Sequence, residues 1–424
     1  MKKRWIKNFD ELAITENRRL ALEIAEAGLN AIATEDVILR YIKLENNILT
    51  VEGKEFPLSK YKRIKVVGFG KAVGEAALAL EKVLGDKIET GAIVGRQRVN
   101  CKYIESFVGT HPKPTEINIP AGKRIYEIIK DSKEDDLIIV LVSGGGSALL
   151  SYPESEVEQG TRLYENALKS GQTINETNMV RKHLSLLKGG GLAKLAYPAT
   201  VIGLIFSDVP GDNFSEVASG ATYKDETTIA DTQKIIDQYN LGRYDLIETP
   251  KEDKYFEKVH NFVLVSNKTA VEAMAKKAGE LGLQANIIST ELYDEVDEAL
   301  EKIIGAGKNN TFVLAAGEPK LVVIKKGGSG GRCLYMGLRA VKNKIVDENS
   351  VLIPLASDGM DNSDAAGAVI DRNTYEKIEK LDIDIDDYLD RYDAYPVFQK
   401  SGDMIMTGPT GANVSDLMIL LTKK

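Results

Sequence analysis

The chain has 424 residues, more than one ordinary hydrophobic core organises, so we expect two or three domains with a cleft between them. Hydrophobic residues make up 43% of the chain and charged residues 28%, a balance that excludes a disordered or a membrane-embedded protein. The net charge is -8 with both signs interspersed. Nucleic acid and membrane surfaces are therefore not expected partners, because each would need a basic stripe.

The two cysteines, Cys101 and Cys333, are too few for a disulfide framework or a four-thiolate metal site. The first residues show no apolar segment of the kind that directs secretion, and no run of about 18 apolar residues could span a bilayer. These features predict a cytoplasmic enzyme.

Apolar residues at helical spacing between Glu11 and Tyr41 predict one or two helices early in the chain. Short apolar runs follow, each ending in a loop rich in glycine, serine or aspartate: residues 64–67, 137–142 and 200–206. Helical patterns lie between these runs, at 72–84 and 121–130. This alternation predicts a parallel sheet covered by helices, because parallel strands need crossover connections and both faces of the sheet must be buried.

A polar and charged stretch from Tyr239 to Lys258, with Pro250 inside it, is the predicted domain boundary. We therefore expect an N-terminal domain over residues 1–245 and a C-terminal domain over residues 255–424. The second half contains six short apolar runs: 262–265, 285–288, 311–314, 322–324, 351–353 and 404–406. These runs predict a second α/β domain with a mixed sheet.

The run Ser-Gly-Gly-Gly-Ser at residues 143–147 directly follows an apolar run that ends at Val142. Three successive residues without a Cβ let backbone N–H groups point at one ligand at contact distance. A helix expected to start at about Ala148 would add the positive end of its dipole. A strand-to-helix turn alone needs only one glycine, so the triplet and its flanking hydroxyls predict a phosphate or carboxylate site.

Lys71 follows the loop Gly68-Phe69-Gly70 and falls in the first turn of an expected helix. A lysine there opposes the helix dipole by roughly 0.3 to 1 kcal/mol unless an anion is bound. The pattern fits either a solvent-exposed lysine or a lysine that binds an anion. A second run, Lys188-Gly189-Gly190, again couples a cation to bare backbone and predicts a phosphate contact. His183, shortly before it, is more typical of a structural residue.

In the second half, Arg332 comes directly after the glycine-rich run 327–331. Its planar, bidentate donors suit a phosphate or a carboxylate. Four aspartates that follow expected strands are candidate magnesium ligands or general bases: Asp208, Asp212, Asp358 and Asp361. Taken singly, each is more typical of a turn or a helix cap.

The common nucleotide-binding motifs are absent, since the chain has neither a Walker A sequence nor the signatures of protein kinases. One pattern favours a different ligand. Gly68-x-Gly70-x3-Gly74 after an apolar run is a loose form of the dinucleotide fingerprint, and Arg96 would then stand near a 2′-phosphate. Lys71 inside that turn is atypical of the fingerprint.

Short motifs recur in a particular order along the chain: Gly68-Phe69-Gly70-Lys71-Ala72, Thr110-His111-Pro112-Lys113-Pro114, Ser143-Gly144-Gly145-Gly146-Ser147-Ala148-Leu149, Asn178-Met179-Val180-Arg181-Lys182-His183-Leu184-Ser185, Lys188-Gly189-Gly190, Ser207-Asp208-Val209-Pro210-Gly211-Asp212, Ala218-Ser219-Gly220, Gly330-Gly331-Arg332, Asp358-Gly359-Met360-Asp361, Asp364-Ala365-Ala366-Gly367 and Thr407-Gly408-Pro409-Thr410-Gly411-Ala412-Asn413. In this order they resemble the class II glycerate kinases, the family whose C-terminal part is called the MOFRL domain. The resemblance extends from about Arg63 to the end. It implies ATP-dependent phosphorylation of D-glycerate to 2-phosphoglycerate with Mg²⁺, a reaction of central carbon metabolism. It also implies a Rossmann-like N-terminal domain, with the active site in the cleft between it and the second domain.

The resemblance implies that Lys71 and Arg332 are active-site residues, and both are also the cations that stand out in the loops described above. Two departures from the family pattern concern the substrate contacts. Where the family commonly continues Asn-Gln-Glu after Arg332, this chain has Cys333-Leu334-Tyr335. The usual Asp-Gly-Pro-Thr-Asp is replaced by Asp361-Asn362-Ser363-Asp364.

We predict that the backbone of Ser143 to Ser147 holds the carboxylate of glycerate. Lys71 then neutralises the transferring phosphoryl group, and Arg332 reaches the same charge when the domains close. Asp208 is the candidate acceptor of the hydroxyl proton, although the sequence leaves open which aspartate is the base and which is the metal ligand. The remaining predicted contacts are to Mg²⁺, from Asp358 and Asp361, and to phosphate, from Lys188, Gly189 and Gly190.

Two other functions fit parts of the sequence. An NAD(P)-dependent hydroxypyruvate reductase would use the Gly68 to Gly74 loop for a pyrophosphate, and it would need one of three histidines as acid or base: His111, His183 and His260. A sugar-acid sensor without turnover would keep the glycine loops and would not need Lys71. The sequence leaves open which hydroxyl is phosphorylated, which nucleotide is preferred and whether the chain forms a homo-oligomer.

Overall fold

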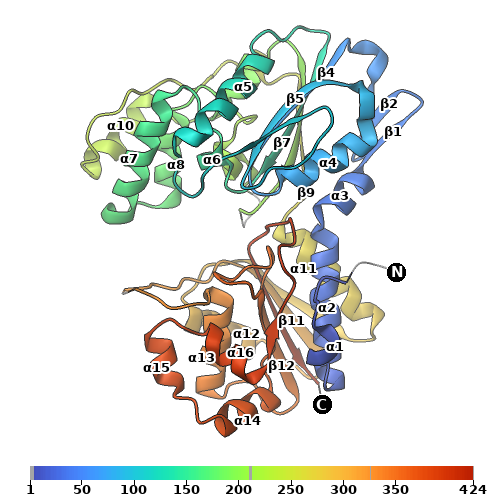
Figure 1. Cartoon of the computed structure of the whole chain (residues 1–424), viewed down its shortest axis with the longest axis vertical. Coiled ribbons are helices and arrows are strands. Elements are labelled where there is room, and N and C mark those ends of the chain that lie inside the picture. The colour runs from blue at the N-terminus through green and yellow to red at the C-terminus, as the bar shows by residue number, and fades with distance from the viewer. Residues whose placement is uncertain (1–3, 210–212, 325, 424) are drawn as a thin grey trace. The chain divides into compact units, whose positions relative to one another are not determined.

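The computed structural model describes residues 4–209, 213–324 and 326–423 (Figure 1). It divides into two compact units. One comprises residues 34–264 and is called the parallel-sheet unit below. The other comprises residues 1–33 together with 265–424 and is called the mixed-sheet unit.

The parallel-sheet unit is built on six strands in the order β6-β5-β4-β7-β8-β9. Their bounds are β4 Arg63–Phe69, β5 Ile88–Gly95, β6 Glu105–Val108, β7 Asp136–Ser143, β8 Thr200–Phe206 and β9 Val259–Val265. The registers from β6 through β8 are all parallel, as the sequence predicts. Every residue of β7 is buried, which explains why this central strand reads as a continuous apolar run.

Helices connect these strands and complete the core of the parallel-sheet unit. They are α3 Thr34–Tyr41, α4 Val73–Leu84, α5 Ile119–Ile129, α6 Gly146–Leu149, α7 Ser155–Ser170, α8 Ile174–Lys182, α9 Gly191–Ala196 and α10 Ile229–Gln238. Helices α5 and α9 bury their apolar faces with β4, β5, β7 and β8 in one cluster that includes Val67, Ile125 and Val140. A small antiparallel sheet also belongs to this unit: β1 Ile42–Glu45, β2 Ile48–Val51 and β3 Lys54–Pro57.

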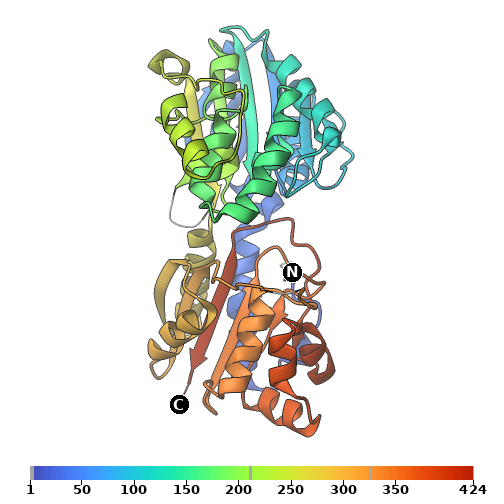
Figure 2. The same cartoon turned by 90° about the vertical axis from the view of Figure 1, so that its left-hand side faces the viewer.

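The mixed-sheet unit has six strands in the order β10-β11-β15-β12-β13-β14. Their bounds are β10 Gln284–Leu292, β11 Thr311–Gly317, β12 Ser350–Ala356, β13 Gly367–Ala368, β14 Met404–Ile405 and β15 Asp416–Thr422. Strands β10 and β11 are parallel and the other pairs are antiparallel, so the predicted mixed sheet is confirmed. Strand β15, red in Figure 2, lies between β11 and β12 although it comes last in the chain.

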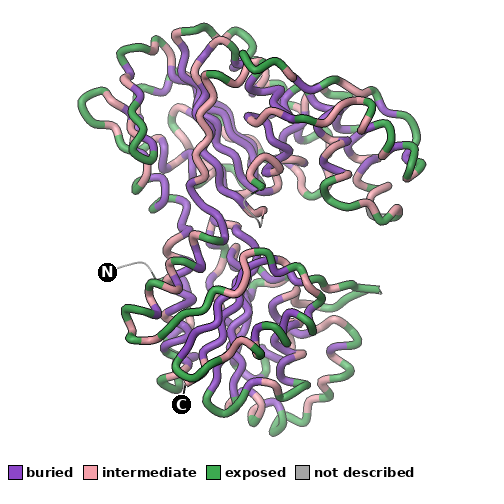
Figure 3. The backbone as a smooth tube through the Cα atoms, turned by 180° about the vertical axis from the view of Figure 1, so that it is seen from behind, coloured by how far each residue is buried: buried purple, intermediate pink, exposed green. Residues whose placement is uncertain are grey.

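Eight helices of the described chain surround the mixed sheet: α1 Phe9–Leu12, α2 Glu16–Ile32, α11 Asn267–Glu280, α12 Val296–Gly305, α13 Arg332–Asn343, α14 Arg372–Lys380, α15 Ile385–Asp390 and α16 Tyr395–Ser401. Helix α2 packs against α11 and against strands β12 and β15. In the described residues no helix is both long enough and apolar enough to cross a bilayer. Figure 3 shows the buried strands at the centre of each unit and the exposed backbone around them.

The limits of the units differ from the predicted boundary between residues 245 and 255. The chain passes from one unit to the other after Ala33 and after Leu264, so the first helices belong with the C-terminal half. Arg18 of α2 fixes them there, because its fully buried guanidinium donates to Asp371 at 2.6 and 2.7 Å and to Asp403 at 2.7 Å. The polar stretch 239–258 that suggested a boundary belongs to the parallel-sheet unit.

Two of the predicted strands in the second half behave differently. The run 262–265 forms the end of β9 and completes the parallel sheet instead of starting a new one. The run 322–324 is not a strand: Val322, Val323 and Ile324 are 62%, 49% and 82% exposed and pair with no neighbour in the described sheets. A short apolar run identifies a strand only when the fold supplies a partner for its backbone.

Candidate anion-binding site

The turn after β7 carries the glycine triplet. Strand β7 ends at Ser143 and the four-residue helix α6 begins at Gly146, two residues before the predicted start. Gly145 has φ +81°, a conformation that favours glycine. The backbone N–H groups of Gly144, Gly145, Gly146 and Ser147 donate to no acceptor in the described part of the chain. Four adjacent amides are therefore available to an anion.

The loop after β4 is tied directly to this turn. The backbone N–H of Lys71 donates to the carbonyl of Gly144 at 2.8 Å, and the N–H of Ala72 donates to the buried Ser143 hydroxyl at 3.0 Å. Gly70, at φ +131°, lies so close to Ser143 that a Cβ would overlap it. These contacts fix the start of the Lys71 side chain beside the glycine triplet.

Side chains that line the triplet come from three separate loops. A Cβ on Gly145 would lie 3.1 to 3.2 Å from the imidazole of His111 and 3.2 Å from Cγ of Lys71. A Cβ on Gly144 would overlap the carboxylate of Asp208. The hydroxyl of Ser147 is 2.8 Å from that of Ser219. The glycines thus leave room for a base, a cation and a carboxylate around one backbone turn.

Positive charge gathers around His111. Burial lowers the pKa of His111 to about 4, and the cations of Lys71, Arg96 and Arg181 lower it further. His111 is consequently neutral at physiological pH. In the described part of the chain none of these three cations forms an ion pair with a carboxylate. Three cations without a carboxylate partner in the described residues thus act on His111, whose ring borders Gly145 of the triplet.

Sequence reasoning singled out Lys71 and Asp208 but did not assign His111 or Arg181 to the site. Both residues occur in the motifs that support the family resemblance, at positions 111 and 181. These motifs were therefore a sequence signal for both residues. Their proximity to the triplet could not be inferred, because they come from segments about 35 residues before and after it.

The second predicted phosphate contact, Lys188-Gly189-Gly190, is occupied by the protein itself. Lys188 is fully buried, where its ammonium donates to the Glu156 carboxylate and to the carbonyl of Leu150. The N–H groups of Gly189 and Gly190 donate to the carbonyls of Ser219 and Gly220 at 2.9 and 2.8 Å. These groups hold the loop 219–220 in place beside the triplet, and they offer nothing to a ligand. His183 is likewise fully buried and bonded to Ile247 and Thr227, which agrees with a structural role.

Arg332 begins α13 in the mixed-sheet unit. Its Nε donates to Asp416 at 2.8 Å, and its Nη1 lies 3.4 Å from a Glu318 oxygen. Its Nη2 makes no hydrogen bond within the described part of the chain. The side chain is 38% exposed, so the guanidinium keeps donors for a further anion. Burial opposes the charged form of Arg332, but the carboxylates of Asp416 and Glu318 outweigh it and raise the pKa of the guanidinium.

The glycine-rich run before Arg332 has a different purpose from the triplet. A Cβ on Gly328 would overlap Asp393, and a Cβ on Gly331 would overlap Asp361. The N–H of Ser329 donates to Asp393 at 2.8 Å, and that of Gly331 donates to Asp361 at 3.0 Å. The run accommodates two internal carboxylates and is not an open cradle.

The two predicted metal ligands differ in what they are free to do. Asp361 is buried and accepts the N–H groups of Gly331, Cys333 and Leu334 at 3.0, 3.2 and 2.7 Å, so it caps α13. Asp358 is partly exposed and its Oδ1 accepts one bond, from the N–H of Met360 at 3.0 Å. In the described residues no three or more His, Cys, Asp and Glu side chains gather as a metal site would need. Asp212, the fourth candidate aspartate, lies outside the described residues.

We expect Gly145→Ala to raise the KM for an anionic substrate about tenfold, because the added methyl would meet His111 and Lys71 at a φ of +81°. Gly171→Ala is the matched control: its φ is +73°, and a Cβ there would meet nothing within 4 Å. Both variants should lose similar stability in urea unfolding, since both strain the backbone. An equal loss of substrate affinity in the two variants would contradict the site.

A second prediction concerns pH. Burial raises the pKa of Asp416 to about 7, although the Arg332 cation opposes the shift. A carboxyl whose pKa is higher in the folded protein than in the unfolded chain binds its proton more tightly when folded. It therefore contributes stability at acidic pH that is lost as pH rises through about 7. We expect urea midpoints to fall between pH 5 and pH 8 more steeply in the wild type than in Asp416→Asn. Equal slopes would show that Asp416 ionises normally.

The turn after β4 does not serve a dinucleotide. A pyrophosphate would need the free N–H groups of that turn, and those of Lys71 and Ala72 already bond to the β7 turn. The fold and the available donors are those of an α/β enzyme whose substrate is a small anion.

The chain matches known protein families over most of its length. Residues 20–249 match a domain of unknown function, DUF4147, and residues 311–416 match the MOFRL family. It is 35% identical to the glycerate 2-kinase of Pyrococcus horikoshii, covering 95% of this chain and 98% of that one. It is 34% identical to the D-glycerate 2-kinase of Thermotoga maritima, covering 95% and 97%. The crystal structure of a glycerate kinase from Thermotoga maritima superposes with a TM-score of 0.83 at 31% identity, over 95% of this chain and 99% of that one. The chain belongs to the DUF4147/MOFRL family of glycerate 2-kinases.

Relatives from Agrobacterium vitis bear the name putative hydroxypyruvate reductase, at 34% identity over 85% of this chain. That name corresponds to the alternative function considered from the sequence. The occupied amides of the β4 turn give it no support.

Proposed function

We infer that this protein is a glycerate 2-kinase, which transfers a phosphoryl group from ATP to the 2-hydroxyl of D-glycerate. Relatives of that name match it over nearly the whole chain. The observation that carries the inference at the level of residues is the turn after β7, where four free amides lie beside His111 and Lys71, and where Lys71, Arg96 and Arg181 together lower the pKa of that histidine.

We place the carboxylate of glycerate on the N–H groups of Gly144 to Ser147. Backbone donors suit a carboxylate because they are fixed before the substrate arrives and need no reorganisation. The cations of Arg96, in the loop after β5, and of Arg181, in the last turn of α8, add attraction. Neutral His111 can donate or accept one hydrogen bond at the substrate without adding charge.

In the transfer step the 2-hydroxyl oxygen forms a bond to the γ-phosphorus, and the bond from that phosphorus to the β–γ bridging oxygen breaks. The hydroxyl proton passes to the carboxylate of Asp208, which borders Gly144, and ADP leaves. Lys71 neutralises the negative charge on the transferring group. Arg332, whose Nη2 is available, binds phosphate oxygens of the donor.

Mg²⁺ commonly accompanies ATP in such reactions and prefers one or two carboxylates together with phosphate oxygens. Asp358 fits this requirement because it is partly exposed and lightly bonded, whereas the oxygens of Asp361 are taken up by helix amides. Asp358 is therefore the proposed ligand, and Asp361 has no oxygen left for the ion. The ion would supply positive charge on the phosphates of the donor.

The test is to incubate the purified protein with D-glycerate, ATP and Mg²⁺, to measure ADP, and to identify the product by phosphorus NMR. We expect ADP and 2-phosphoglycerate in equal amounts. A product of 3-phosphoglycerate would correct the regiochemistry. No ADP, together with NADPH oxidation on addition of hydroxypyruvate, would replace the kinase by the reductase.

A further inference from the structure

A pocket in the mixed-sheet unit lies beside Arg332 and is not explained by the binding of glycerate. Its volume is about 700 Å³, within the range of pockets for drug-sized ligands. Apolar and aromatic side chains make up much of its wall: Leu321, Val322, Val323, Tyr335 and Tyr392. Glycerate has only about seven non-hydrogen atoms and cannot fill such a space. A kinase must also bind a second and much larger substrate.

We propose that this pocket binds the nucleobase and ribose of the phosphoryl donor, with the phosphates directed to Arg332. The inference rests on the proposed function, since it assigns the ATP site of that reaction. A flat purine ring needs an apolar and aromatic wall, and its phosphates need a cation at one end. The pocket has both, because Arg332 lines it together with the aromatic residues.

The segment 321–324, called the apolar strap below, supports the assignment. Val322 and Val323 are 62% and 49% exposed and lie on the wall of the pocket. Covering water-exposed valines at a pocket wall removes apolar surface from water, which favours the binding of a ligand there. In the described part of the chain the N–H groups of the apolar strap donate to no acceptor, so they are also available to the polar edge of a base.

Two tyrosines of the pocket hold the strap in place. The Tyr392 hydroxyl donates to the carbonyl of Val322 at 3.1 Å, and the rings of Tyr392 and Tyr335 stack with centroids 5.7 Å apart and planes inclined by 23°. A Cβ on Gly327 would lie 3.4 Å from Cβ of Tyr392 and 3.6 Å from a Val323 methyl. The strap and the tyrosine pair therefore form a wall that exists before a ligand binds.

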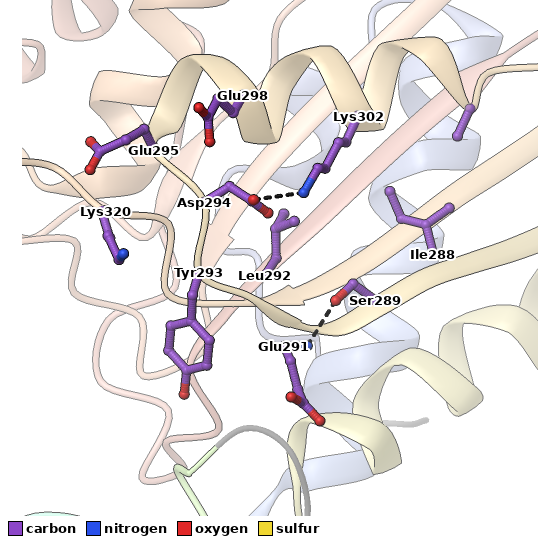
Figure 4. Close-up of a pocket in the computed structure, with 11 residues that line it drawn as sticks. Ile288, Ser289, Glu291, Leu292, Tyr293, Asp294, Glu295, Glu298, Lys302 and Lys320 are labelled. Atoms are coloured by element: carbon purple, nitrogen blue, oxygen red, sulfur yellow. Dashed lines mark hydrogen bonds and ion pairs between the residues drawn. The ribbon is translucent and has the colours of Figure 1, made fainter. Parts of the chain in front are cut away.

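A neighbouring pocket of about 670 Å³ is a poorer candidate for ATP (Figure 4). It shares Tyr293 and Lys320 with the first pocket. Its other lining charges are four carboxylates and one lysine: Glu291, Asp294, Glu295, Glu298 and Lys302. Lys302 already donates to Asp294 at 2.6 Å, as Figure 4 shows, so the pocket presents net negative charge to a polyanion. Electrostatics favour the pocket that contains Arg332.

The test compares ATP with inorganic tripolyphosphate, which carries the phosphates without the base. Binding of each is measured by calorimetry on the full chain, for the wild type and for the double variant Val322→Ser/Val323→Ser. Both valines are exposed, so the fold should not change. Ile14→Ser is the matched control, since Ile14 is 53% exposed in the same unit and outside the pocket.

We expect the double variant to weaken ATP binding about tenfold and to leave tripolyphosphate binding within twofold. The KM for ATP should rise in the same proportion while the KM for glycerate stays constant. Unchanged ATP binding in a protein that still phosphorylates glycerate would overturn this inference alone. Equal weakening of ATP and tripolyphosphate would also overturn it, because the strap would then act on the phosphates. A wild-type protein that binds no ATP would refute the proposed function as well.

Discussion

Lys71→Ala is expected to lower kcat by at least about a hundredfold, the effect of removing one charge that stabilises a transition state. The loop that carries Lys71 is fixed by hydrogen bonds from its own N–H and that of Ala72 to the β7 turn, so the side chain has a defined origin. Its ammonium has no carboxylate partner among the residues that the structure describes. Folding should therefore not depend on it, and the loss should appear in turnover and not in stability.

The control for Lys71 is Lys82→Ala, which removes a lysine that is 58% exposed and paired with Glu35. Exposed pairs of this kind contribute little to stability, about 1 kcal/mol at most. Both variants should unfold at nearly the wild-type urea concentration, and only Lys71→Ala should lose turnover. Near-normal kcat in Lys71→Ala would remove Lys71 from the reaction.

Asp208→Asn should lower kcat by roughly a hundredfold to ten-thousandfold, the range for loss of a general base. The carboxylate of Asp208 lies against the Cα of Gly144, so it borders the space in which we place glycerate. Asparagine keeps the shape of the side chain but cannot accept the hydroxyl proton.

The control for Asp208 is Asp86→Asn, which neutralises an exposed carboxylate in the short turn after α4. It separates the loss of a base from the change in net charge. A drop of less than tenfold in Asp208→Asn would assign the proton to another acceptor.

The sequence predicted the strands of the parallel sheet well because of how such sheets are buried. Strand β7 is covered on both faces, so each of its residues is apolar or otherwise buried and the run is continuous. The run 322–324 contains the same apolar residue types as β7 but has no partner strand in the described sheets. Nothing local separates the two cases, because strand formation depends on a partner that is distant in sequence.

The structure brings candidate site residues together where a local rule applied, and it gives them internal partners where a residue distant in sequence decided. The glycine triplet and Lys71 follow from backbone geometry near the end of a strand, and the structure brings them together. Lys188 looked equally promising, but its carboxylate partner Glu156 stands 32 positions earlier in the chain. Asp361 was predicted as a metal ligand, but it caps a helix that begins about thirty residues earlier in the chain, and the sequence around Asp361 does not reveal that contact. Burial partners of this kind are fixed by tertiary structure alone.

The order in which the chain visits its two units has a consequence for synthesis. Helix α2 leaves the ribosome early, but β12 and β15, against which it packs, follow more than 300 residues later. The intervening residues 34–264 form a unit complete in itself and can fold while translation continues. The nascent α2 must meanwhile keep its apolar face and the charge of Arg18 without their final partners. A chaperone that shields this segment until the last strand emerges would raise the yield of native protein.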